Sequence, residues 1–144
     1  MNVCLTAPVT SLERSTHGTI SGQVWLVWPD ASFPEEGWSD LIIGVVLAFA
    51  EATTKIRSGQ VQETVVYFLD GPFSVHLSSA SPEQLGMRMC RRDDTWFTVV
   101  ADLDEWIDSV RIVARSTVAR CHELGWRSSE LDKLESLVRV GDLS

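Results

Sequence analysis

The middle third of the chain, residues 64–100, reads as four short strands separated by turns. Residues 73–78 alternate apolar and polar side chains, and a period of two is the period of a strand. Asp70-Gly71 before this run and the polar residues 92–94 after the next one mark turns, because glycine tolerates the positive φ of a tight hairpin. Consecutive hairpins predict an antiparallel meander, and the rest of the chain must pack around it.

A strand and a helix are predicted ahead of this meander. Residues 19–28 are rich in β-branched and aromatic side chains and end at Pro29, which is typical of one strand. From Trp38 to Phe49, apolar residues recur at spacings of three and four, and this places them on one face of a helix. We expect that helix to be capped at residue 37 or 39 and to end near Ile56.

Two helices are predicted after the meander. Asp102 and Glu105 form a D-x-x-E helix start, and an apolar stripe continues from there to Cys121. Gly125 predicts the end of this helix, and a shorter one follows, capped by Ser128 or its neighbour. The order of strand, helix, four strands and two helices predicts an α+β fold. In it, an antiparallel sheet of about five strands carries helices mainly on one face.

We expect one domain over residues 1–144, because no repeat, low-complexity tract or linker interrupts the chain. Residues 1–18 have no firm place in this scheme, apart from a short strand expected within residues 2–8. No secretion signal or membrane-spanning stretch is recognisable, and an odd number of cysteines with no CxxC spacing is typical of a reducing compartment. We therefore expect a soluble, cytoplasmic protein with reduced cysteines at positions 4, 90 and 121.

Charge gives the clearest indication of a class of function. The chain has 20 acidic and 12 basic residues, for a net charge of -8. Such a surface repels phosphate backbones and anionic lipid, so nucleic acid and membranes are disfavoured and a basic protein partner is favoured. Helix starts and solvated surfaces account for part of the acid density. The predicted partner-binding residues are two acid clusters and one aromatic anchor, namely Asp102, Asp104, Glu105 and Asp108; Asp30, Glu35 and Glu36; and Trp28. Asp40 also groups with the second cluster in the sequence, near the expected first turn of the helix, where the dipole favours an acid.

No set of residues predicts a reaction. Asp70 lies in the apolar run YFLDGPF and is interpreted as a turn residue, because only His76 lies near enough in the sequence to act with it. Cys121 and His122 are adjacent on a helix and point about 100° apart, so we expect no metal site and no cofactor. No hydrolase elbow, P-loop or dinucleotide motif occurs. We expect a protein that is not an enzyme. The alternative is a small enzyme or ligand-binding protein with a pocket between sheet and helices that uses Asp70 and His76.

Three segments resemble the small immunity proteins of bacterial contact-dependent inhibition and related polymorphic toxin systems. The strand, "FP…GW.D" loop and amphipathic helix of those proteins are similar to VWPDASFPEEGWSDLIIGVVLAFAEA, and their D-G-P hairpin is similar to YFLDGPFSVHL. Their closing "C…GW…L..L" helix pair is similar to CHELGWRSSELDKLESLV, so the resemblance spans residues 20–138. It implies a cytoplasmic inhibitor without catalytic residues that binds the toxic domain of a cognate effector, often a nuclease. A protein-binding adaptor or subunit without catalysis is the alternative.

Overall fold

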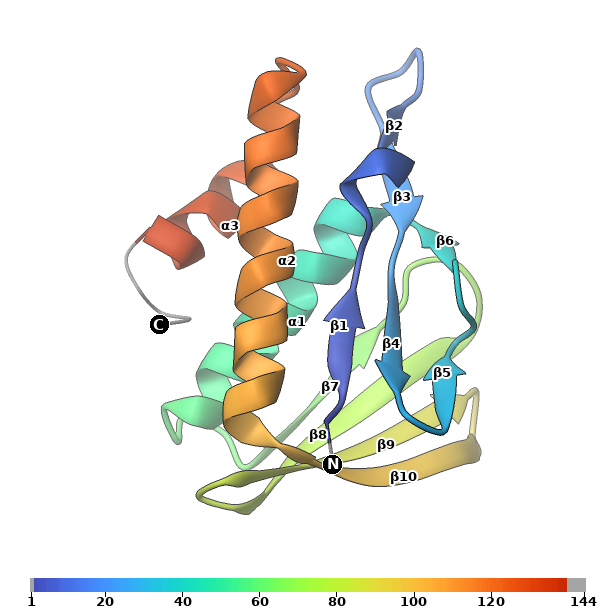
Figure 1. Ribbon diagram of the computed structural model, residues 1–144, viewed down its shortest axis with the longest axis vertical. Coiled ribbons are helices and arrows are strands. Elements are labelled where there is room, and N and C mark those ends of the chain that lie inside the picture. The colour runs from blue at the N-terminus through green and yellow to red at the C-terminus, as the bar shows by residue number, and fades with distance from the viewer. Residues whose placement is uncertain (1, 140–144) are drawn as a thin grey trace.

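The computed structural model describes residues 2–139 and has an α+β fold with three helices and antiparallel sheets (Figure 1). The predicted meander is confirmed as a four-stranded sheet with the order β10-β9-β8-β7. Each strand pairs with the next one along the chain, so local hairpins set the register. The strands are β7 (Glu63–Tyr67), β8 (Phe73–Ser81), β9 (Gln84–Arg91) and β10 (Asp94–Asp102).

The segment expected to be one strand over residues 19–28 is divided between two smaller sheets. Its first half pairs with one set of strands and its second half with another, while the Val24 N–H between them donates to the Trp38 carbonyl oxygen at 2.8 Å. The prediction of one sheet of about five strands was therefore wrong. The strands form sheets of three, three and four. The reason is that the residues before Val24 and the residues after it pair with different strands. One small sheet has β3 (Ile20–Gln23) between β2 (Glu13–Arg14) and β6 (Ser39–Asp40), and the other has β4 (Trp25–Trp28) between β1 (Cys4–Thr6) and β5 (Ala31–Phe33).

The three helices are α1 (Ile42–Arg57), α2 (Leu103–Glu123) and α3 (Ser129–Arg139). The start of α1 differs from the prediction, because residues 39–40 form β6 and no side chain caps the helix. The start of α2 is confirmed, since the Asp102 carboxylate accepts a hydrogen bond from the Glu105 N–H at 3.0 Å. For α3, the Ser128 hydroxyl oxygen accepts from the Leu131 N–H at 3.0 Å. Within residues 2–139, no helix has both the length and the apolar character needed to cross a membrane.

Residues 2–18, which the sequence left without a firm place, belong to the fold. A single-turn helix, η1 (Val9–Ser11), links β1 to β2. Val3 and Leu5 are buried, and the Leu5 N–H donates to the Ser109 hydroxyl of α2 at 3.0 Å. That hydroxyl in turn donates to the Trp106 carbonyl at 2.8 Å, so the first strand is fixed to the first two turns of α2 by a buried relay of hydrogen bonds.

The helices and the small sheet β1-β4-β5 lie on the same side of the four-stranded sheet (Figure 1). Between the layers, Trp106 of α2 packs edge to face on Phe49 of α1, with ring centroids 5.6 Å apart. The Trp106 indole N–H, buried with its ring, donates to the Thr53 hydroxyl at 3.0 Å. Phe33 of β5 sits edge-on against Phe73 of β8 at 5.6 Å. The apolar side chains of one face therefore fill the interior, and the opposite face of the sheet is left at the surface.

Candidate functional site

The acid cluster at the start of α2 is exposed, and half of it stabilises the helix itself. Asp102 caps α2, and Asp108 forms an ion pair with Arg111 one turn further along. Asp104 and Glu105 lie in the first turn, where the helix dipole favours acids. These two carboxylates are the ones in the cluster best able to bind a partner. Binding to Asp102 would compete with the helix cap, and binding to Asp108 would compete with its ion pair.

The second acid cluster is also exposed but lies on different elements. Asp30 is in the turn between β4 and β5, and Glu35 and Glu36 are in the connection from β5 to β6. The Glu35 carbonyl accepts from the Trp38 N–H at 3.2 Å, which closes a turn in that connection. The structure thus presents the two predicted clusters as separate acidic areas, each held by a short turn or a helix start.

Trp28, the predicted anchor, belongs to the interior. Its side chain is 5% exposed and meets Phe97 of β10 edge to face at 5.0 Å. Trp25 is buried as well, although a spacing of three residues places the two rings on opposite faces of a regular strand. Because the Trp28 ring packs in the core, it offers no surface to a partner in this conformation.

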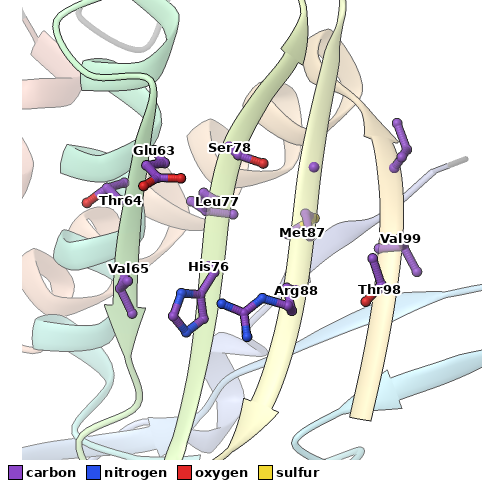
Figure 2. A pocket seen from close by; sticks show the side chains of 12 residues that line it. Glu63, Thr64, Val65, His76, Leu77, Ser78, Met87, Arg88, Thr98 and Val99 are labelled. Carbon is purple, nitrogen blue, oxygen red and sulfur yellow. The ribbon is translucent and has the colours of Figure 1, made fainter. Parts of the chain in front are cut away.

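The open face of the four-stranded sheet carries a groove of about 480 Å³, here named the sheet groove (Figure 2). Strand register places Val65, His76, Arg88 and Thr98 in one row across β7, β8, β9 and β10. The Arg88 side chain extends toward the His76 ring, and the helices lie behind the sheet in this view (Figure 2). The predicted pocket between sheet and helices is not what the structure shows, because core side chains fill that layer and this hollow lies on the other side.

Charge in the sheet groove is mixed. Burial and the positive charge of Arg88 lower the pKa of His76, and the carboxylate of Glu63 opposes them. Arg88 also donates to the Thr95 hydroxyl at 3.4 Å. Gly86 lets the Ser78 side chain lie close against the β9 backbone, since a Cβ there would lie 2.6 Å from the Ser78 hydroxyl oxygen. His76 and Arg88 share one row, and the Glu63 carboxylate lies opposite Ser78, two residues further along β8, so the groove is a polar surface without a dominant charge.

The structure does not bring Asp70 and His76 into one site. His76 lines the sheet groove, whereas Asp70 lies at another hollow beside Asp40. The interpretation of Asp70-Gly71 as a turn is confirmed: Gly71 has a φ of 79°, and the Phe68 N–H donates to the Phe73 carbonyl across the loop at 3.0 Å. Among residues 2–139, no group of three His, Cys, Asp or Glu side chains is arranged to hold a metal ion.

Asp40 is the acid whose position sequence reasoning missed. It is only 4% exposed, and its carboxylate accepts hydrogen bonds from the Leu41 N–H at 2.6 Å and the Trp38 indole N–H at 3.0 Å. The Asp70 N–H in the β7–β8 loop donates to the same carboxylate at 3.1 and 3.2 Å. Asp40 therefore ties the start of α1 to a loop that is 30 residues further along the chain. The pair Trp38 and Asp40 within GWSD was the only signal of this in the sequence.

Two adjoining hollows meet at Leu41 and Leu69, and together they are named the Leu41–Leu69 groove. The first has a volume of about 340 Å³ and is also lined by Asp40 and Asp70. The second, of about 180 Å³, runs between the starts of α1 and α3 and is also lined by Gly44. Leu41 is 42% exposed and Leu69 is 53% exposed, which is unusual for two neighbouring leucines on one rigid surface.

No protein-family model matches this chain, and no curated protein or solved structure matches it either. The resemblance to immunity proteins accordingly stays a prediction from the three segments that carry it. A functional proposal for this chain therefore rests on the geometry and charge of residues 2–139 together with that resemblance.

Proposed function

We propose that this protein is an immunity protein that binds and neutralises a cognate bacterial toxin domain. The observation that carries the proposal is the exposure of all seven predicted carboxylates on a chain with a net charge of -8. A toxin domain that acts on nucleic acid needs a basic surface for its substrate. An acidic inhibitor competes for that surface, because opposite charges attract it to the groove that the substrate would occupy.

The fold suits such a role because the acids are held in place before binding. Asp104 and Glu105 are in the first turn of a long helix, and α2 is fixed through Trp106 to the core. Asp30 lies in a hairpin turn, so its backbone position is set by the pairing of β4 with β5. Groups that are already ordered lose little conformational freedom on binding, and more of the interaction energy appears as affinity.

The proposal is tested by co-expression with any toxin domain that is encoded next to this chain. We expect cells that produce the toxin domain to survive only when this protein is present, and the two proteins to elute together in size-exclusion chromatography. If neither rescue nor a complex is found with any neighbouring toxin domain, the proposal is wrong. A tight complex with a partner that is not toxic would identify an adaptor instead.

The role of charge is tested with the double variant Asp104→Lys and Glu105→Lys, which leaves the Asp102 cap in place. We expect its association rate at low salt to fall about tenfold or more and its salt dependence to flatten, because steering weakens. The matched control is the double variant Glu13→Lys and Glu51→Lys, which changes the net charge equally at two exposed acids of β2 and α1. Equal slowing in both double variants would show that net charge matters and the α2 cluster does not.

A further inference from the structure

We propose that the Leu41–Leu69 groove is a docking site for a partner segment that carries apolar side chains flanked by Lys or Arg. The inference rests on the proposed function in one respect, which is that the segment would belong to the toxin domain. The site is separate from the acid clusters, since none of their seven carboxylates lines either hollow of the groove.

The first reason is an apolar surface that two distant parts of the chain place together, with a polar edge from a third. Leu41 precedes α1, Leu69 lies in the β7–β8 loop, and the second hollow extends to Ser128 and Glu130 at the start of α3. Both leucines leave about half of their side chains in water. A contiguous exposed apolar surface with a polar rim is typical of an interaction site.

The second reason is that the groove is built rather than incidental. The Asp40 carboxylate holds the backbone of Leu41 and of Asp70, and so fixes both walls relative to each other. Gly44 lets two side chains that line the groove pack directly on the α1 backbone, because a Cβ at that position would lie 2.7 Å from the Leu69 Cδ1 atom and 3.1 Å from the Glu130 Oε2 atom. When the groove is already ordered, less conformational entropy is lost on binding than when the groove is mobile.

The third reason is charge, which selects the occupant. Asp70 lines one hollow and Glu130 lines the other, and the residues that line these two hollows include no Lys, Arg or His. A second copy of this acidic chain would bring like charges together, and an anionic membrane would be repelled. A segment with leucine-like side chains beside Lys or Arg matches both the leucines and the two acids.

The direct test uses a synthetic peptide of alternating leucine and lysine pairs and its counterpart with glutamate in place of lysine. We expect the lysine peptide to shift the backbone amide resonances of Leu41, Gly44 and Asp70, and to bind about tenfold or more tighter than the glutamate peptide. Shifts confined to the sheet groove, equal binding of both peptides, or no binding of the lysine peptide would each overturn the docking site.

Gly44→Ala separates binding from folding. The new methyl group displaces the tip of Leu69, which is exposed and free to turn away, so we expect the protein to stay folded. Because the displaced Leu69 side chain no longer forms the same groove wall, the lysine peptide should bind about tenfold more weakly. Ile112→Ser, which removes an exposed apolar side chain from α2, and Asp132→Asn, which removes an acid from the first turn of α3, should leave peptide binding unchanged. Equal binding by Gly44→Ala and wild type would overturn the docking site.

The toxin domain gives a second arm that separates this inference from the proposed function. If wild type and Gly44→Ala neutralise the toxin domain equally well, the docking site is wrong and the proposed function stands. If the lysine peptide binds at the groove but no toxin domain binds the protein, the docking site stands and the proposed function fails. If sedimentation shows a dimer that Leu69→Glu dissociates, the occupant is a second copy and the inference is wrong.

Discussion

Replacing Asp40 with alanine removes the carboxylate that joins β6 to the β7–β8 loop. Three N–H groups lose their acceptor, from Trp38, Leu41 and Asp70. A hydrogen bond to a charged group contributes about 1.5–3 kcal/mol. Water replaces part of this bonding, because Leu41 is exposed and Trp38 is half-buried. We therefore expect the free energy of unfolding to fall by about 3 kcal/mol, within the range of large single-residue effects.

The loss is measured by urea unfolding and by hydrogen exchange of the loop amides. For a domain of about 150 residues, a loss of about 3 kcal/mol corresponds to a fall in Tm of about 6–12 °C. The Asp70 amide should also exchange faster than in wild type, because its acceptor is gone. Asp40→Asn keeps one acceptor oxygen and should lose only part of the stability. Asp104→Ala, at an exposed carboxylate, should change it by about 0.5 kcal/mol or less.

The reasoning about Asp40 is refuted if Asp40→Ala unfolds within about 1 kcal/mol of wild type and the Asp70 amide keeps its protection. That result would mean that water satisfies the three donors as well as the carboxylate does. A large loss with unchanged protection at Asp70 would place the effect at the start of α1 alone.

Further predictions concern the hairpin loop, a histidine and the cysteines. Gly71→Val should cost about 2 kcal/mol or more by chemical denaturation, since a β-branched residue is strained at a φ of 79°, whereas Asp70→Asn should be nearly neutral. The pKa of His76 lies below its ordinary 6.5, so the unfolded chain takes up the proton first and stability falls as the pH drops through about 6.5 toward the folded-state pKa. His76→Gln should flatten this dependence when unfolding is measured at several pH values. Burial raises the pKa of the Cys121 thiol, so an alkylating reagent followed by mass spectrometry should modify the less buried Cys4 first, and equal rates would contradict the burial of Cys121.

The parts of the fold that the sequence predicted well are those set by near neighbours. Each hairpin of the meander is closed within a few residues, so alternation and turn chemistry were enough to predict β7 to β10. The start of α2 follows from Asp102 and Glu105, which are three positions apart. The residues that determine a capped helix start or a hairpin lie close together in the sequence, so both can be predicted without knowing the tertiary fold.

The parts that failed depend on distant residues. Nothing within residues 19–28 reveals that β3 pairs with β2 and β6 while β4 pairs with β1 and β5. Trp38 fits the helical period of the residues after it and was expected on the helix. Its backbone instead precedes β6, and its indole N–H donates a hydrogen bond to the Asp40 carboxylate. The candidate site was missed for the same reason, because Leu69 and Gly44 become neighbours only through tertiary packing.

The hydrogen bond from the Leu5 N–H to Ser109 joins residues that are 104 positions apart. During synthesis β1 can therefore form its contacts with α2 only after α2 has been made, so this part of the core forms late in folding. A fragment trimmed to residues 20–138, the span of the immunity-protein resemblance, would lack Val3 and Leu5 and leave an apolar slot beside β4 and α2. Strand β1 is thus made before α2 but secured only after it, and an expressed form of this domain should keep residues 3–6.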